Sequence, residues 1–214
     1  MAAFNKDTKF LSCPVIYQGR GLYTNGGKTF KPLSIDVRHF IQANDFFLER
    51  IIKDEGIWDL ADYDSIMLAC LKLVRKYVKY TPDKAQLGVD EYWTFPNETL
   101  LLGTGDCEDM SNLLVSLARN AGVPANLLRV CAGWVVAGDN APLGGHAYPV
   151  YKASDGEWRV IDCCYYPNDL PILKRTPFYL EPYYKDIWFS FNDMGAWSKS
   201  AVPTTIIKSC KKVI

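Results

Sequence analysis

Histidine is scarce in this chain, with only His39 and His146 among 214 residues. A reaction that needs an imidazole base therefore has almost no competing assignment. Cysteine occurs seven times, but without a Cys-x-x-Cys pair or a cluster of cysteine and histidine ligands. The adjacent Cys163 and Cys164 have poor geometry for a single tetrahedral ion. Zinc is thus a weak alternative, and single cysteines become the residues of interest.

The sequence also lacks an excess of charge and long apolar runs. Its 24 basic residues balance 24 acidic ones, so the composition indicates neither nucleic acid nor an anionic membrane as a partner. No segment approaches the roughly 18–20 apolar residues of a membrane span. Lys6, Asp7 and Lys9 interrupt the place of a signal peptide's apolar region. Since the odd cysteine count also favours a reducing compartment, we expect a cytoplasmic protein, or part of a particle assembled in the cytoplasm.

What the sequence does contain is typical of a folded globular protein, with 49% apolar and 22% charged residues. Its length is sufficient for one domain with substantial arms. Residues 1–33 are rich in turn formers, and Asn25 followed by Gly26 predicts a hairpin or an extended arm. Residues 34–166 form the predicted core. Residues 167–214 are aromatic and proline-rich without clean periodicity, which favours an extension packed on the core over an exposed partner surface.

Helical periodicity dominates the first part of the predicted core. Apolar spacing predicts a helix over residues 34–55, with Ser34 as N-cap and Gly56 as stop, and another over residues 64–80. A third helix is expected to begin at or just before Cys107. Three short β-branched and aromatic segments then predict neighbouring antiparallel strands: residues 127–136, 147–151 and 158–162. Helices followed by strands are typical of an α+β fold.

A cysteine, a histidine and an aspartate follow one another in contexts that suit a nucleophile, a base and an orienting carboxylate. Cys107 lies in GDCED, where Asp106 is a suitable N-cap and Asp109 occupies the capping-box position. A helix N-terminus and a nearby imidazole would both favour the thiolate over the thiol. His146 follows two glycines, and Asp162 ends the next predicted strand, where a hairpin would bring it close to the imidazole. Each residue alone has an ordinary structural role open to it, but together they predict a nucleophilic site.

The chain resembles the transglutaminase-like cysteine-enzyme superfamily, and most closely its bacterial cysteine peptidases, in three segments: YWTFPNETLLLGTGDCEDMSNLLVSLARNAGVPANLLRVCAGW, GGHAYPVY and WRVIDCCYY. The resemblance covers about residues 90–166. It implies a papain-like α+β core in which the nucleophile helix packs on an antiparallel sheet. It also implies Cys107 as nucleophile, His146 as base and Asp162 as orienter. The chain departs from the family pattern after Asp162, where members often have a small, turn-forming residue and this sequence has two further cysteines.

The resemblance further implies an oxyanion hole made of the Cys107 backbone N–H and one upstream side chain. Trp93 is the candidate for that second donor, with Asn97 behind it. An aromatic residue at this place could equally be a wall of the site or part of the core.

A calcium ion is a second implication, because carboxylates near the nucleophile can hold calcium in the bacterial peptidase branch. Asp106, Glu108 and Asp109 offer the hard oxygen ligands that calcium prefers. Helix capping explains two of these acidic residues without a metal. We expect no cofactor to be required, with calcium as an option.

The resemblance implies thiol-dependent acyl transfer on peptide or amide bonds. Hydrolysis by a cysteine peptidase or amidase is favoured, with a protein or peptide as substrate. Crosslinking or deamidation by a transglutaminase is one alternative. A non-enzymatic module is another, in which the N- and C-terminal arms dock the domain into a larger assembly such as a virion or secretion machine.

Overall fold

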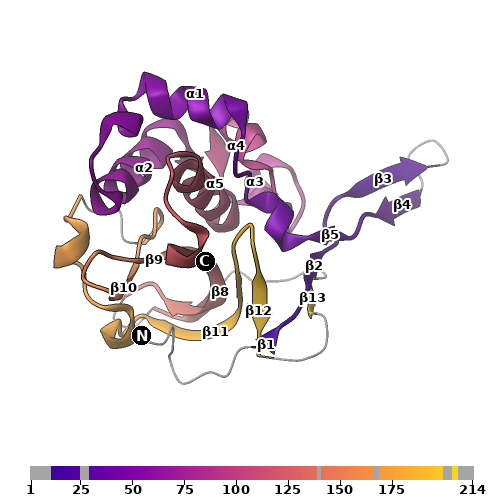
Figure 1. Ribbon diagram of the computed structural model, residues 1–214. Coiled ribbons are helices and arrows are strands. Elements are labelled where there is room, and N and C mark those ends of the chain that lie inside the picture. The colour runs from indigo at the N-terminus through magenta and orange to yellow at the C-terminus, as the bar shows by residue number, and fades with distance from the viewer. Residues whose placement is uncertain (1–10, 25–28, 139–140, 166–168, 200–203, 207–214) are drawn as a thin grey trace.

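The computed structural model describes residues 11–24, 29–138, 141–165, 169–199 and 204–206. Its α-helices are α1 (Phe46–Asp54), α2 (Tyr63–Tyr77), α3 (Asp83–Gln86), α4 (Pro96–Leu102) and α5 (Cys107–Asn120). The short 3₁₀ turns are η1 (Val37–Phe40), η2 (Ile57–Asp59), η3 (Ala125–Leu127), η4 (Ile172–Lys174) and η5 (Phe178–Leu180). Figure 1 shows the α-helices gathered on one side of the molecule and the long strands on the other. The expected α+β fold is confirmed.

One antiparallel sheet of six strands supports the helices. Its order is β1 (Leu11–Ser12), β12 (Ala196–Ser198), β11 (Tyr184–Phe191), β8 (Leu128–Val136), β9 (Leu143–Lys152) and β10 (Trp158–Val160). The smaller sheets are β13 (Thr204–Ile206) with β2 (Val15–Tyr17) and β5 (Ile35–Asp36), the ribbon β3 (Gly21–Thr24) with β4 (Thr29–Pro32), and the pair β6 (Lys79–Tyr80) with β7 (Thr104–Gly105). All neighbours in the main sheet run antiparallel.

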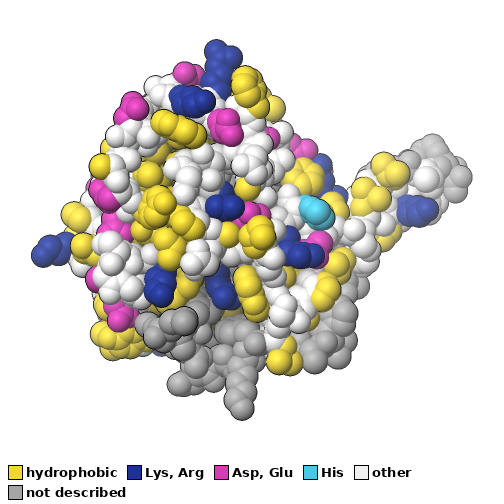
Figure 2. Space-filling view, in the orientation of Figure 1, with side chains coloured by type: hydrophobic (Ala, Val, Ile, Leu, Met, Phe, Trp, Pro, Cys, Tyr) yellow, Lys and Arg dark blue, Asp and Glu magenta, His cyan; other side chains and the backbone are white. Residues whose placement is uncertain are grey.

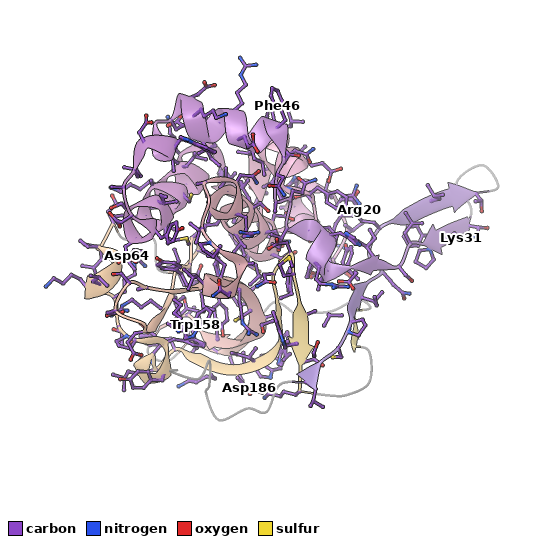
Figure 3. The ribbon with its side chains drawn as sticks, viewed as in Figure 1. Arg20, Lys31, Phe46, Asp64, Trp158 and Asp186 are labelled. Carbon is purple, nitrogen blue, oxygen red and sulfur yellow. The ribbon has the colours of Figure 1, made fainter. Side chains whose placement is uncertain are left out.

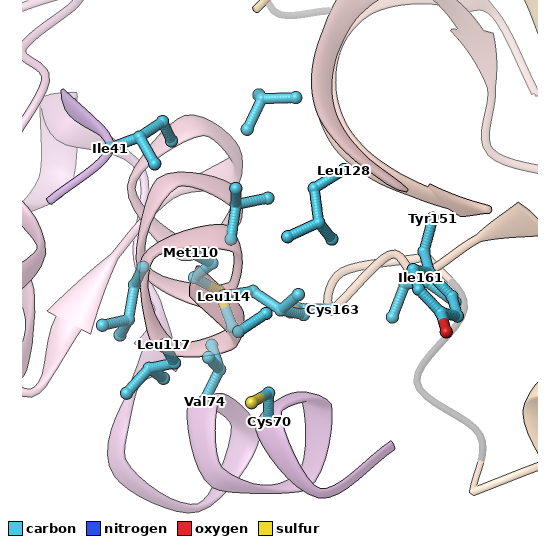
Figure 4. Packing of buried hydrophobic residues seen from close by; sticks show 14 of the residues in the cluster. Ile41, Cys70, Val74, Met110, Leu114, Leu117, Leu128, Tyr151, Ile161 and Cys163 are labelled. Atoms are coloured by element: carbon cyan, nitrogen blue, oxygen red, sulfur yellow. The ribbon is translucent and has the colours of Figure 1, made fainter. Parts of the chain in front are cut away.

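Helix α5 is the centre of the core, and it begins at the residue where the sequence predicts it. Asp106 is its N-cap and forms a reciprocal capping box with Asp109. Leu113, Leu114 and Leu117 are fully buried. The helix contacts α1, α2 and α4 as well as β8 and β9, and Figure 4 shows side chains of α2 and α5 packed together. Removing one such leucine side chain would cost about 2–5 kcal/mol of stability.

The helix predicted over residues 34–55 is wrong in its first half. Strand β5 and turn η1 occupy that half, and α1 begins only at Phe46. Asn44 has a φ of 60°, a left-handed conformation that interrupts a helix, and the Asp45 carboxylate caps α1 by accepting the Leu48 N–H at 3.0 Å. Asn120 of α5 accepts the Asp45 backbone N–H and stabilises this break. Apolar spacing could not reveal that long-range contact.

The predicted N-terminal hairpin is present as the β3–β4 ribbon, while its Asn25-Gly26 turn lies outside the described residues. The ribbon projects from the body of the molecule (Figure 1). Figure 3 shows Arg20 near its base and Lys31 along it. Arg20 makes a two-pronged ion pair with Glu98 of α4 at 2.6 and 2.9 Å, which connects the base of the ribbon to the core.

The C-terminal part of the chain supplies β11 and β12, for which no strands were predicted. Strand β11 pairs with β8 on one edge and with β12 on the other. Its Tyr184, Ile187, Phe189 and Phe191 are buried, so the aromatic composition serves the core. The division of the chain at residues 33 and 166 stays a prediction.

Charged side chains of both signs are interspersed with apolar ones on the face shown in Figure 2, in keeping with the balanced charge of the sequence. No helix among the described residues is long and apolar enough to cross a membrane.

Candidate active site

Cys107 is the first residue of α5 and its side chain is almost covered. The Sγ atom donates a hydrogen bond to Glu108 Oε2 at 3.1 Å. The hydroxyl of Ser111, one turn later, donates to the carbonyl oxygens of Cys107 and of Ala147, at 2.6 and 3.2 Å. Ala147 lies on β9 beside His146, so this hydroxyl fixes the start of α5 against the strand that carries the histidine.

His146 lies on β9, directly opposite Gly133 of β8, and is fully buried. Its Nε2 atom is 2.7 Å from Asp162 Oδ2. Because Nε2 is engaged in this way, Nδ1 is the ring nitrogen left for the hydrogen bond with Cys107. Burial by itself lowers the pKa of His146, but the charges of Asp162 and Cys107 and the hydrogen bonds to both outweigh it and raise the pKa to about 10.

Asp162 lies just beyond β10, the strand that pairs with β9. Its Oδ1 atom accepts the backbone N–H groups of Cys164 and Tyr165 at 2.7 and 3.3 Å. Its Oδ2 atom accepts from His146 and from the Tyr184 hydroxyl at 2.8 Å. Burial raises the pKa of this carboxyl, yet the charge of His146 and these hydrogen bonds outweigh burial and hold the pKa below its usual value. The carboxylate is therefore held charged in one orientation.

Two residues that follow Asp162 complete the surroundings of the imidazole. The Tyr165 ring lies 4.4 Å from the His146 ring, centroid to centroid, and its side chain is half-exposed. The Cys164 sulfur lies within 4.8 Å of a His146 nitrogen and an Asp162 oxygen. Cys163, in contrast, is buried in the main core, so the two adjacent cysteines have different environments.

The three predicted calcium ligands lie in a larger acidic cluster than the sequence indicated. Asp83 of α3 lies within 4.8 Å of Asp106 and Asp109, and also of Glu91 and Glu108, measured between carboxylate oxygens. Burial and the charges of Asp106, Glu91 and Cys107 raise the pKa of Glu108 well above its usual value. Burial and the charge of Asp106 raise the pKa of Asp109 to about 7. The cluster thus crowds carboxyl groups in a buried place, which favours their protonated forms unless a cation balances the charge.

This donor set fits a hard cation such as Ca²⁺. Asp83 belongs to two groups of three carboxylates, one with Asp106 and Asp109 and one with Glu91 and Glu108, and carboxylate oxygens are the ligands that calcium prefers. Glu108 Oε1 is buried and has no hydrogen-bond partner among the described residues. Asp109 also serves the fold, because its two oxygens accept the backbone N–H groups of Thr94 and Asp106 at 2.8 and 3.2 Å. Helix capping and cation binding are therefore compatible at this residue.

Of the two expected oxyanion donors, Trp93 has its donor group engaged elsewhere. The Trp93 indole N–H donates to Glu91 Oε1 at 2.8 Å, and the ring stacks on Tyr17. Asn97 lies on α4, where its side-chain oxygen accepts the Glu98 N–H at 2.8 Å. Trp93 would have to release Glu91 before it could bind an oxyanion.

Sequence comparison decides the family of this chain. A sequence model of the transglutaminase-like superfamily matches residues 57–163, half of the chain. The chain belongs to the transglutaminase-like superfamily. The match ends one residue after Asp162 and includes every predicted site residue. No curated protein sequence matches this chain.

Solved structures show the same fold. LapG from Legionella pneumophila, in an EGTA-treated form, aligns with a TM-score of 0.52 and 19% identity over 71% of this chain and 83% of LapG. A second LapG structure gives the same TM-score and identity over 71% and 86%. A calcium-bound LapG structure gives 0.46 and 20% identity over 74% and 92%. The match of the family model to residues 57–163 confirms the superfamily predicted from the sequence motifs.

Proposed function

We propose that this protein is a cysteine hydrolase that cleaves peptide or amide bonds, with Cys107 as nucleophile, His146 as base and Asp162 as orienter. The observation that carries the proposal is the His146 imidazole, which lies between a buried carboxylate at 2.7 Å and the Cys107 sulfur. A buried acid at Nε2 fixes the tautomer in which Nδ1 can accept the thiol proton. Membership of the transglutaminase-like superfamily supports the same chemistry.

The residues would act in two half-reactions. Cys107 attacks the substrate carbonyl carbon with its proton held on His146 Nδ1, the protonated state that the raised pKa of His146 favours, and the backbone N–H of Cys107 at the start of α5 stabilises the developing oxyanion. The C–N bond then breaks, and His146 returns the proton to the departing amine or ammonia. Water attacks the resulting thioester with His146 as base, which releases the carboxylic acid and regenerates the thiol. A lysine amine in place of water would give a crosslink, and this remains the alternative outcome of the same pathway.

The experiment that tests the proposal does not need a known substrate. Iodoacetamide alkylation followed by mass spectrometry would compare Cys107 with Cys13 in the wild type and in His146→Ala. We expect Cys107 to be alkylated at least about tenfold faster than Cys13, and His146→Ala to remove this difference. The two histidines allow a matched control, since His39→Ala should leave the rate unchanged. Equal reactivity of the two cysteines would refute the nucleophile and favour a non-enzymatic assembly module.

Calcium binding is a second proposal, supported by the acidic cluster. Asp83 would hold the ion together with Asp106 and Asp109, or together with Glu91 and Glu108. Bound calcium would neutralise these buried carboxylates and stabilise the loop before α5. Titration of the EGTA-treated protein with CaCl₂ should raise the thermal midpoint, whereas MgCl₂ should do so less, because Mg²⁺ demands a tighter octahedral site. If the thermal midpoint does not respond to calcium while Cys107 is hyper-reactive, the calcium proposal is refuted and the proposed triad stands.

The location and the partners also remain proposals. We propose a reducing compartment, supported by the six cysteines of the described region, all of which are free thiols. A protein or peptide would be the substrate, and the projecting β3–β4 ribbon would be available for contact with a larger assembly.

A further inference from the structure

We propose that Tyr184 is a positioning residue for the reaction and acts through Asp162; this inference rests on the proposed function. Its hydroxyl donates to Asp162 Oδ2 at 2.8 Å, the same oxygen atom that accepts the His146 Nε2–H at 2.7 Å. Tyr184 lies on β11, beyond the stretch that carries the family motifs and beyond the residues that the family model matches.

The sheet places Tyr184 beside the triad. Tyr184 is directly opposite Val135 on β8, and His146 is directly opposite Gly133, two residues earlier on the same strand. Opposed residues in antiparallel strands share a face, and so do residues two apart on one strand. Tyr184 and His146 therefore lie on the same face of the sheet, on either side of β8. Asp162 reaches that face from the end of β10 and bonds to both.

The hydroxyl completes the set of donors around the carboxylate. Two backbone N–H groups fix Oδ1, while His146 and Tyr184 share Oδ2. Without the Tyr184 hydroxyl, the His146 imidazole would be the one donor to Asp162 Oδ2 left among the described residues. The imidazole is itself the group that Asp162 has to orient, so it cannot serve as the fixed reference. Two donors at distinct directions restrict rotation of the carboxylate about its Cβ–Cγ bond, so the Nε2–H···Oδ2 bond keeps its geometry while Nδ1 gains and loses a proton. Tyr184 is almost completely buried, so water does not replace the hydroxyl.

Tyr148 offers a matched control on the same face. It is directly opposite Cys131 on β8, its ring lies 4.5 Å from that of Tyr184, and it is fully buried. Its hydroxyl has no hydrogen-bond partner among the described residues. Tyr148→Phe and Tyr184→Phe thus remove the same atom from the same aromatic cluster, but only the second removes a hydrogen bond to Asp162.

The rate of Cys107 alkylation and the NMR signals of His146 would change on substitution of Tyr184 only if this residue positions the site and does not merely pack in the core. We expect Tyr184→Phe to slow alkylation of Cys107 by roughly tenfold, the equivalent of one hydrogen bond to a charged group. The Nε2–H proton signal of His146 should shift, while that of His39 stays in place. Tyr148→Phe should change neither. In an Asp162→Asn background, Tyr184→Phe should have no further effect on the rate, because the two residues act as one unit.

Three results would overturn the inference. One is a Tyr184→Phe variant whose Cys107 is alkylated at the wild-type rate, while alkylation in Asp162→Asn is slow. That result would support the triad and refute a positioning role for Tyr184. Another is an equal loss in Tyr148→Phe and Tyr184→Phe, which assigns the effect to packing. If Tyr184→Phe does not fold, 3-fluorotyrosine can be placed at position 184, because it keeps the hydroxyl and nearly the same volume while making the hydroxyl a stronger hydrogen-bond donor. The third result that would refute the inference is an unchanged His146 Nε2–H signal in this fluorinated protein. Failure of the proposed function is distinct, because Cys107 would already be unreactive in the wild type.

Discussion

Replacing Asp162 with asparagine should slow acyl transfer far more than it destabilises the fold. The substitution keeps the size of the side chain but exchanges one oxygen for an NH₂ group. Four hydrogen-bond donors converge on the native carboxylate. The two backbone donors on Oδ1 cannot turn into acceptors, so the amide oxygen must stay with them. The amide NH₂ then faces Tyr184 and His146, and His146 Nε2 must become an acceptor.

That change moves the imidazole proton to Nδ1, the nitrogen that should receive the proton of Cys107. The rate of acyl transfer should therefore fall by about 10³–10⁴-fold, or about 4–5.5 kcal/mol in barrier height. The free energy of unfolding should fall by about 2 kcal/mol, because a charged hydrogen-bond acceptor is replaced by a neutral one. For a chain of this size it corresponds to a decrease in the thermal midpoint of about 4–8 °C.

The assay combines turnover on a peptide or amide library, thermal unfolding and the ¹⁵N shifts of the His146 imidazole. The shifts should report the Nδ1–H tautomer in Asp162→Asn. Wild-type turnover in a folded Asp162→Asn protein would refute the reasoning, as would an imidazole that retains the proton on Nε2. A variant that fails to fold would show that Asp162 is needed first as a turn cap.

Three further predictions concern the same region. The pKa of His146 is raised to about 10 from an unfolded value of about 6.5. Its contribution to stability is therefore complete below pH 6.5 and is lost as the pH rises toward 10. In thermal melts, the stability difference between wild type and His146→Gln should shrink between about pH 6 and pH 10. Ser111→Ala should lower the thermal midpoint by about 2–4 °C and slow Cys107 alkylation, and a rate equal to wild type would show that the hydroxyl does not position the nucleophile. Calcium at about 100 times its dissociation constant should stabilise the protein by about 2.7 kcal/mol, and Glu108→Gln should reduce this gain in calorimetry.

Local sequence patterns were sufficient for the parts of the site that depend on local structure. The start of α5 follows from Asp106 as N-cap and Asp109 in the capping box, and the hairpin of β9 and β10 follows from their alternating residues and the turn between them. Cys107, His146 and Asp162 could be named because each lies at the end of, or within, an element that its own neighbours specify. The long predicted helix over residues 34–55 failed for the opposite reason, since a contact with Asn120 decides its break.

Residues brought in by long-range pairing could not be found in this way. Asp83 reaches the acidic cluster because β6 and β7 pair in parallel, with Tyr80 opposite Gly105, which places the residues following each strand side by side. The two strands are only two residues long and are separated by two helices, so they leave no periodic signal. Tyr184 lies in an aromatic segment whose composition indicates burial but not a partner.

The dependence of Asp162 on β11 connects the family core to the less recognisable part of the chain. The matched region contains Cys107, His146 and Asp162, yet β8 lies between β9 and β11, and β11 carries the fourth hydrogen-bond donor to Asp162. With the triad as proposed, the residue at position 184 should therefore matter to the geometry of the site as well as to packing. A substitution at position 184 that preserves the sheet can still change the rate, because one hydroxyl oriented toward Asp162 affects the imidazole through a shared oxygen atom. The chemistry proposed for Cys107, His146 and Asp162 should thus depend on a fourth side chain, Tyr184 of β11, which motif recognition does not reach.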